Sequence, residues 1–205
     1  MFDLILQRCD ALTKNFNEIA DDRKLLLTQL AEHIQTKLDE QLPVNLVYVC
    51  THNSRRSHLG QVWAAIAANY YGIEHVFTFS GGTEATAFNA NAIRALVASG
   101  CKVVPTDDTP NPLYLVCYGL EEMVNCFSKH YTHEANPKTD FVAIMTCSEA
   151  EDHCPFLPGC DLRIGTTYHD PKTFDDTPLQ DEKYIERSNQ IAMECLYVFS
   201  KVNQK

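Results

Sequence analysis

Residues 44–57 read VNLVYVCTHNSRRS. The first seven residues are almost continuously apolar, which is typical of a buried parallel strand. A polar loop follows Cys50. From Ser57 onward, apolar residues recur at spacings of three and four, which places them on one face of a helix. They are Leu59, Val62, Trp63, Ile66, Ala67 and Tyr70. The stretch therefore predicts a strand, a loop and a helix, with Cys50 at the carboxyl end of the strand.

The loop after Cys50 has the composition of an oxyanion site. Loop amides and a helix N-terminus direct N–H groups at one point, and Arg56 can bind two oxygens of an anion at once. The same positive surroundings favour a thiolate, which is the nucleophilic form of cysteine. Ser57 can donate a hydrogen bond to that sulfur, and Asn53 can hold the shape of the loop. The alternative is a buried structural cysteine in an ordinary turn.

The pattern Cys50-x5-Arg56-Ser57 resembles the phosphate-binding loop of the low-molecular-weight protein tyrosine phosphatases. It is still more similar to the loop of the thioredoxin-coupled arsenate reductases of the same fold, Cys-Thr-x-Asn-Ser-x-Arg-Ser. His52 and Arg55 depart from that pattern, because a small residue is usual at the first position and a cysteine or apolar residue at the second. The resemblance implies that the loop residues bind the oxyanion substrate. They are Thr51, His52, Asn53, Ser54, Arg55 and Arg56.

The composition fits one globular domain. A chain of 205 residues is long enough for a full core. A net charge of −10 argues against nucleic acid or an anionic membrane as a partner. No stretch approaches a membrane-spanning length, and Gln7, Arg8 and Asp10 interrupt the first apolar run too early for a signal peptide. We therefore expect a cytoplasmic protein whose nine cysteines are thiols, some of them redox-active, and not a disulfide framework.

Strands alternate with helices along the chain, which predicts an α/β fold with a central parallel sheet of four strands. The strands are expected at residues 44–50, 75–79, 141–146 and 162–167. Helices are expected at 57–70, 91–99 and about 177–199, and a glycine-rich turn at 80–84. Two further short strands are expected at 101–106 and 113–118. The resemblance implies that these elements form the three-layer fold of the low-molecular-weight phosphatases.

Two segments lie outside the family core that the resemblance implies. Residues 1–43 are expected to be an N-terminal extension of two helices packed on the core, which Pro43 ends; a dimer contact is the alternative. Residues 44–205 are expected to form the phosphatase-like α/β domain. Within it, residues 107–138 are longer than the core needs and are expected to be an insertion.

Residues 147–155 read CSEAEDHCP. They resemble the redox segment of the arsenate reductases, where two cysteines at this spacing follow the third strand and a proline follows the second cysteine. Seven residues of helix would separate the Cα atoms of Cys147 and Cys154 by about 10 Å. A disulfide needs roughly 4.4–6.8 Å, so pairing requires the segment to loop out. Two alternatives are inert buried cysteines and a zinc site of Cys147, His153, Cys154 and Cys160, although structural zinc usually has more closely spaced ligands.

His169-Asp170-Pro171 follows the fourth expected strand. The matching Asp-Pro of the family carries the general acid, so the resemblance implies that Asp170 protonates the leaving group. Asp175 and Asp176 are rivals in the same stretch. A loop aspartate before a turn proline, with no catalytic role, is the alternative.

The resemblance implies arsenate reduction, with arsenate or phosphate as the bound oxyanion. Cys50 attacks arsenic, Asp170 protonates the departing oxygen, and Cys147 and then Cys154 pass the disulfide outward to thioredoxin, the expected electron donor. One alternative is a low-molecular-weight protein tyrosine phosphatase, in which water cleaves a phospho-Cys50 intermediate. The other is a non-catalytic oxyanion or redox sensor. No metal and no cofactor are expected.

Overall fold

The computed structural model describes residues 1–153 and 157–203. The strands are β1 (Val44–Cys50), β2 (Val76–Gly82), β3 (Lys102–Pro105), β4 (Tyr114–Cys117), β5 (Met123–Cys126), β6 (Phe141–Met145) and β7 (Cys160–Gly165). The α-helices are α1 (Asp3–Thr13), α2 (Asp21–Asp39), α3 (Arg56–Tyr70), α4 (Ala90–Ala98), α5 (Ser148–His153) and α6 (Gln180–Phe199). Two short 3₁₀ helices are η1 (Phe16–Glu18) and η2 (Pro171–Phe174).

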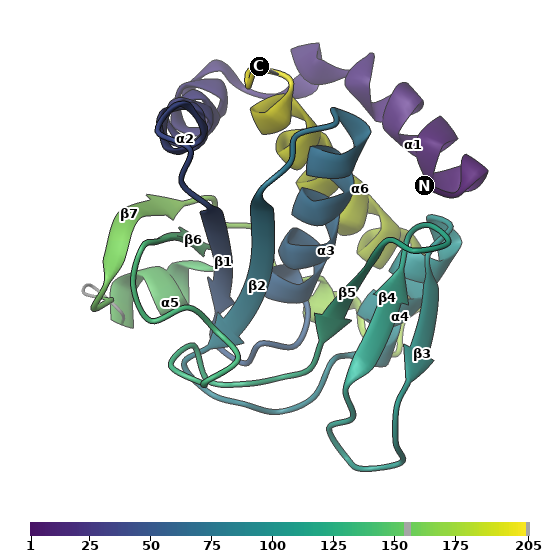
Figure 1. Cartoon of the computed structure of the whole chain (residues 1–205). Coiled ribbons are helices and arrows are strands. Elements are labelled where there is room, and N and C mark those ends of the chain that lie inside the picture. The colour runs from purple at the N-terminus through teal and green to yellow at the C-terminus, as the bar shows by residue number, and fades with distance from the viewer. Residues whose placement is uncertain (154–156, 204–205) are drawn as a thin grey trace.

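Four parallel strands form the central sheet, in the order β2-β1-β6-β7 (Figure 1). Strand β1 lies inside the sheet, where Val49 is in register with Met145 of β6, and Cys50 with Gly82 of β2. The apolar run of β1 is therefore buried on both sides, as its composition predicted. The expected α/β fold with a four-stranded parallel sheet is confirmed, and Cys50 lies at the carboxyl edge of that sheet.

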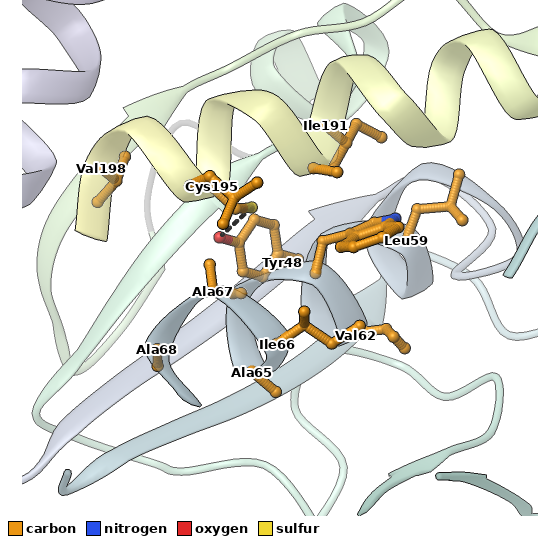
Figure 2. Packing of buried hydrophobic residues seen from close by; sticks show 14 of the residues in the cluster. Tyr48, Leu59, Val62, Ala65, Ile66, Ala67, Ala68, Ile191, Cys195 and Val198 are labelled. Atoms are coloured by element: carbon orange, nitrogen blue, oxygen red, sulfur yellow. Dashed lines mark hydrogen bonds between the residues drawn. The ribbon is translucent and has the colours of Figure 1, made fainter. Parts of the chain in front are cut away.

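The two faces of β1 belong to two different apolar clusters. Leu46 and Tyr48 lie in the large cluster that also contains the inner faces of α3 and α6, whereas Val47 and Val49 lie in a smaller cluster beside α5. Figure 2 shows the ring of Tyr48 among side chains of α3 and α6, with its hydroxyl 3.6 Å from the sulfur of Cys195. The sheet thus has helices on both faces, which gives the expected three layers.

The two N-terminal helices predicted by the sequence are present. Ile5 of α1 and Leu27, Leu30 and Ile34 of α2 are buried in the large cluster. Both helices contact α6, and α2 also contacts β1 and β7. The assignment of residues 1–43 as an extension of a family core stays a prediction. None of the helices in the described ranges combines the length and the apolar composition that crossing a bilayer requires.

The turn predicted at residues 80–84 begins too early, because β2 continues through Gly82. Gly82 pairs with Cys50, and the loop after Cys50 passes directly over it. A Cβ atom on Gly82 would lie 2.6 Å from both the carbonyl oxygen of Thr51 and the nitrogen of Asn53. Only glycine allows two backbone segments to approach this closely. Gly82 in the sequence therefore indicates close backbone contact and not a turn.

A second sheet, of three antiparallel strands in the order β3-β4-β5, lies beside the first (Figure 1). The sequence predicted β3 and β4 but not β5, whose four residues are too few for a clear pattern. After β5 the chain returns to the central sheet, where Gly82 donates its N–H to Lys129 and accepts from Tyr131, both at 2.9 Å. The region expected to be an insertion thus reaches the Cys50 loop.

The ends of two later elements also differ from the sequence prediction. Strand β7 begins at Cys160 and not at Leu162, because Cys160 already pairs with Phe141 across an irregular step in the ladder. Helix α6 begins at Gln180 and not near Thr177. The N–H of Gln180 donates to the carbonyl of Thr177 at 3.1 Å in a tight turn, and the first bond of helical type runs from the N–H of Lys183 to the carbonyl of Leu179 at 2.9 Å.

Candidate active site

The sulfur of Cys50 lies 3.1 Å from the hydroxyl oxygen of Ser57, in the first turn of α3. The side-chain amide of Asn53 donates to that same oxygen at 2.9 Å. Since the Ser57 oxygen already accepts from Asn53, its own hydrogen is available to the sulfur. The predicted contact between Ser57 and Cys50 is therefore present, and it stabilises negative charge on the sulfur.

Asn53 holds the loop in shape, as the sequence predicted. Its φ is 43°, a left-handed conformation that asparagine tolerates better than most residues. Its side-chain oxygen accepts the backbone N–H of Lys129 at 2.9 Å. The hydroxyl of Ser54 also faces the scaffold and donates to the carbonyl of Ala87 at 2.7 Å. Both side chains support the loop, so an anion would meet the main-chain N–H groups of these residues.

Arg56 is buried and is held by the chain that follows β7. One terminal nitrogen donates to the carbonyl of Tyr168 at 2.7 Å, and the other forms an ion pair with Asp170 at 2.7 Å. The third nitrogen, Nε, is buried and has no hydrogen-bond partner among the described residues. The structure thus brings together Cys50, Arg56 and Asp170, the three residues expected to carry the chemistry.

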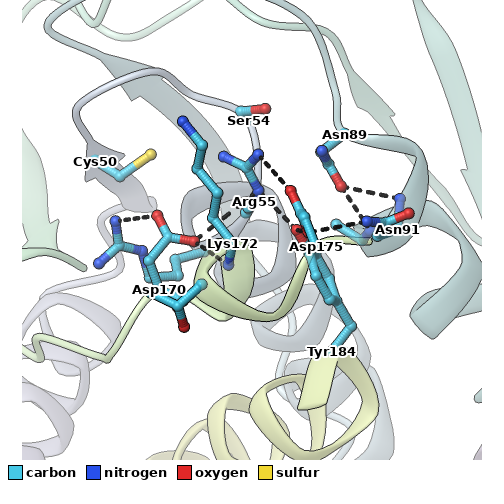
Figure 3. A network of polar contacts seen from close by, with 12 residues as sticks. Cys50, Ser54, Arg55, Asn89, Asn91, Asp170, Lys172, Asp175 and Tyr184 are labelled. Carbon is cyan, nitrogen blue, oxygen red and sulfur yellow. Dashed lines mark hydrogen bonds and ion pairs between the residues drawn. The ribbon is translucent and has the colours of Figure 1, made fainter. Parts of the chain in front are cut away.

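Arg55 lies at the edge of this arrangement (Figure 3). Its Nε donates to the hydroxyl of Tyr184 at 2.8 Å, and its guanidinium pairs with Asp175 at 3.5 Å. The Tyr184 hydroxyl in turn donates to Asp175 at 2.7 Å, and burial raises the pKa of Tyr184 to about 12. Asp175 is therefore engaged with Arg55 and Tyr184, whereas Asp170 pairs with Arg56 at 2.7 Å and more distantly with Arg55, at 3.9 Å.

A cavity of about 490 Å³ lies beside the loop. Its lining includes five side chains that can carry positive charge, from the loop and from the segment after β7. They are His52, Arg55, Arg56, His169 and Lys172. Asp170 and Glu149 also line it, and the half-exposed His52 lies 3.5 Å from Glu84. The cavity thus concentrates positive groups near Cys50 although the whole chain is acidic, which suits an anionic substrate.

Cys147 lies just beyond the end of β6, beside the loop. The N–H of Thr146 donates to the carbonyl of Val49 at 2.7 Å, which holds the two strand ends together. Cys147 is 1% exposed and shares its apolar cluster with Cys50. Its sulfur lies 3.4 Å from the hydroxyl of Thr51, which also donates to Glu149 at 3.1 Å. Two predicted redox cysteines are therefore neighbours at one edge of the sheet.

Cys154, the third cysteine of the predicted relay, lies outside the described residues, together with positions 155 and 156. Helix α5 (Ser148–His153) spans all six residues between positions 147 and 154. One of the four ligands of the zinc alternative is Cys154, which lies outside the described residues. Among the described residues, no three His, Cys, Asp or Glu side chains are grouped closely enough to hold a metal ion. Cys160 instead donates to the carbonyl of Leu162 at 2.9 Å.

Two buried bases lie behind the loop. Burial lowers the pKa of His58 well below its ordinary value, and the charge of Lys129 acts in the same direction. The His58 imidazole is therefore neutral at neutral pH; it stacks on Phe88 at 4.1 Å. Burial also lowers the pKa of Lys129, to about 8. Lys129 is therefore still mostly protonated at pH 7, and above about pH 8 the positive charge next to the loop comes from the arginines.

Sequence reasoning missed two residues of the site, Tyr168 and Lys129. Both act through main-chain atoms: Tyr168 through the carbonyl that accepts from Arg56, and Lys129 through the amide that donates to Asn53. Main-chain contacts leave no side-chain pattern in a sequence. The proximity of Tyr168 to Asp170 along the chain was the one signal that could have identified it.

The architecture of a central parallel sheet with helices on both faces also occurs in solved structures. One is a low-molecular-weight protein tyrosine phosphatase from T. tengcongensis, with a TM-score of 0.54, 14% identity, and coverage of 78% of this chain and 99% of that chain. Another is an arsenate reductase in the phosphate-binding state, with a TM-score of 0.53, 16% identity, and the same two coverages.

A third is a low-molecular-weight phosphotyrosine phosphatase from Vibrio cholerae, with a TM-score of 0.53, 11% identity, and coverage of 77% of this chain and 95% of that chain. The chain has the low-molecular-weight phosphatase fold. No protein-family model matches it, and no curated protein matches its sequence. At these identities the likeness shows the low-molecular-weight phosphatase fold alone, so the chemistry rests on the residues of the site.

Proposed function

We propose that this protein reduces arsenate to arsenite by a relay of thiols, with thioredoxin as the electron donor in the cytoplasm. One observation carries the proposal: Cys147 lies at the end of the strand next to the one that ends at Cys50, with Thr51 3.4 Å from its sulfur. Val49 is opposite Met145, so Cys147 is one residue past the position opposite Cys50. With neighbouring strands about 4.8 Å apart and a rise of about 3.3 Å per residue, the two Cα atoms are roughly 6 Å apart, which falls within the roughly 4.4–6.8 Å between the Cα atoms of a disulfide.

In the first step the Cys50 thiolate attacks arsenic. A sulfur–arsenic bond forms and one arsenic–oxygen bond breaks, with Asp170 supplying the proton so that the oxygen leaves as water. Arg56 and the loop N–H groups hold the remaining oxygens. The buried Nε of Arg56 is available to the anion, and Asp170 must exchange its contact with Arg56 for the leaving oxygen.

The second step moves the electrons. The Cys147 thiolate attacks the sulfur of Cys50, the sulfur–arsenic bond breaks, and its electron pair stays on arsenic, which changes from As(V) to As(III). Arsenite leaves and a Cys50–Cys147 disulfide remains. Cys154 then attacks Cys147, which frees Cys50 and leaves a Cys147–Cys154 disulfide that the two thiols of thioredoxin reduce.

Hydrolysis of phosphate monoesters, including phosphotyrosine, is the second candidate. It requires Cys50, Arg56 and Asp170 but neither Cys147 nor Cys154, because water cleaves the phospho-cysteine. The ion pair between Arg56 and Asp170 supports this reaction as well as the first. Both reactions use one site, so the protein can have both activities.

The deciding experiment measures arsenate-dependent oxidation of NADPH with thioredoxin and thioredoxin reductase, beside hydrolysis of an aryl phosphate. The proposal predicts turnover in the first assay, and a loss of that turnover without thioredoxin. Aryl-phosphate hydrolysis without arsenate turnover would leave the phosphatase as the function. No turnover in either assay would contradict both, and would favour an oxyanion or redox sensor.

A further inference from the structure

An arginine from the N-terminal helices reaches the segment that carries Asp170. Arg23 of α2 donates from one terminal nitrogen to the carbonyl of Thr167 at 2.7 Å. The centre of its guanidinium lies 5.3 Å from the centroid of the Tyr168 ring. Its Nε pairs with Glu194 of α6 at 3.6 Å. Arg23 therefore contacts Thr167 and Tyr168, two consecutive residues of the segment that connects β7 to Asp170.

Tyr168 is held on every side by these contacts. Its hydroxyl donates to the second oxygen of Glu194 at 2.8 Å, and its N–H donates to the carbonyl of Thr146 at 3.1 Å. Its carbonyl accepts from Arg56 at 2.7 Å. The ring and both main-chain groups of Tyr168 thus have fixed partners, and Asp170 follows two residues later.

Arg23 also stabilises the charge that fixes this tyrosine. Glu194 is 3% exposed, and burial raises its pKa, which the charge of Arg23 opposes. Without Arg23, a buried carboxylate would lose its nearest ion-pair partner, which is costly. Glu194 would then be protonated or would reorient, and the Tyr168 hydroxyl would lose an ionised acceptor.

We propose that Arg23 is a positioning residue for the proposed reactions: through Thr167 and Tyr168 it holds the backbone that sets Asp170 against the leaving oxygen. The inference rests on the proposed role of Asp170 and assigns a task to the N-terminal helices. A displacement of about 1 Å at a reacting group can cost a reaction about 100-fold. Contacts that fix Tyr168 therefore act on catalysis from outside the cavity.

The test compares Arg23→Met with Arg8→Met. Arg8 of α1 also reaches α6, where it donates to Asn189 at 3.3 Å, but its bond does not involve Thr167 or Tyr168. The two variants therefore remove a similar arginine from the same pair of helices. The substrates are phenyl phosphate, whose leaving group needs the proton most, and 4-nitrophenyl phosphate, whose leaving group needs it least.

We expect Arg23→Met to lower kcat/KM for phenyl phosphate about 10-fold, but for 4-nitrophenyl phosphate less than about 3-fold, because kcat/KM reports the step that expels the leaving group and a displaced acid matters most for the poorer one. Arg8→Met should keep both rates within about twofold of the unchanged protein. An equal loss for the two substrates, or the same loss in Arg8→Met, would overturn the proposal.

A second measurement does not depend on activity. Amide hydrogen exchange in residues 166–172 should be faster in Arg23→Met than in Arg8→Met. If the unchanged protein hydrolyses neither substrate, the phosphatase candidate fails, while faster exchange would still support the positioning contact. Unchanged exchange in Arg23→Met would refute it. Should Arg23→Met not fold, Tyr168→Phe removes only the hydroxyl bond to Glu194 and should show the same dependence on leaving group.

Discussion

The Cys50 loop and the segment after Cys147 lie beside one cavity, but they are held very differently. In the loop, the Asn53 side chain bonds both Ser57 and the amide of Lys129, and Arg56 is fixed by two partners. The segment after Cys147 is the six-residue helix α5, whose described bond to the loop joins Thr51 and Glu149 at 3.1 Å. One region is braced from several elements, and the other is a single short helix, in which Ala150 is buried and Glu149 bonds Thr51.

This difference matches the two tasks that the proposed reaction sets. Stabilising an oxyanion requires donors that are already in place before the charge develops. Passing a disulfide from Cys50 to Cys154 requires Cys147 to change partners, and an intact helix would keep Cys147 and Cys154 about 10 Å apart. Ser148 and Glu149 are exposed, so unwinding α5 there exposes little apolar area. The comparison therefore pairs a fixed binding site with a segment suited to move.

The largest effect is expected for Cys50→Ser. A serine hydroxyl is not ionised at neutral pH, so turnover of both arsenate and aryl phosphate should fall by on the order of 10⁶-fold, as for other lost nucleophiles. The melting temperature should stay close to that of the unchanged protein. Measurable turnover of both substrates by the folded variant would show that the nucleophile is another residue.

Substitutions in the second region should affect one reaction only. Cys147→Ser and Cys154→Ser should each lower thioredoxin-coupled arsenate turnover by more than about 100-fold, because a disulfide relay needs every thiol. Aryl-phosphate hydrolysis should remain within about twofold. In Cys154→Ser, mass spectrometry after arsenate treatment should find a trapped Cys50–Cys147 disulfide. Full coupled turnover in both variants would exclude the relay.

The bracing of the loop can be weakened at Asn53, and the effect measured as a change in stability. Asn53→Ala loses two hydrogen bonds and places alanine at a φ of 43°, so the free energy of unfolding should fall by about 2–3 kcal/mol. Asn53→Gly relieves the backbone strain but not the lost bonds, and should recover part of that loss. Urea unfolding measures both. Equal stability of the two variants would show that strain at this position is unimportant.

The smallest effect is expected where the two regions meet. Thr51→Val removes the hydroxyl that bonds Glu149, an exposed contact whose loss should cost about 0.5–1 kcal/mol or less. Amide exchange in residues 148–150 should become faster, while the inhibition constant of phosphate stays within about twofold. A large rise in that constant would mean that the loop itself depends on α5, contrary to the comparison.

The braced region is also the one that the sequence predicted best. A strand followed by Cys50, Asn53, Arg56 and Ser57 at fixed spacing carries its chemistry in side chains, and the four parallel strands appear as apolar runs. Arg55 lines the cavity, and its binding of substrate stays a prediction, but the sequence did not predict that its guanidinium contacts Tyr184 and Asp175, more than a hundred residues away in the chain. Contacts of that kind depend on tertiary packing, which periodicity and spacing do not encode.

Other parts of the site and fold could not be predicted, for reasons that differ. Lys129 contributes a main-chain N–H, which every residue except proline can supply, and Tyr168 contributes a carbonyl, which any residue can supply. Strand β5 is four residues long and partly exposed, so its pattern is too short to identify. Gly82 gave a signal, but close backbone contact and a tight turn both call for glycine.

The amide of Lys129 has a consequence for how this region tolerates change in evolution and in protein engineering. Asn53 is held by a backbone N–H, so the bond itself survives most changes of side chain at position 129 but not proline. Deleting one residue between Cys126 and Lys129 would instead shift that N–H by up to about 3.8 Å, more than a hydrogen bond can span. Selection should therefore remove insertions and deletions between Cys126 and Lys129 more strictly than substitutions. In related chains, the length of this segment should be conserved even where its residues vary.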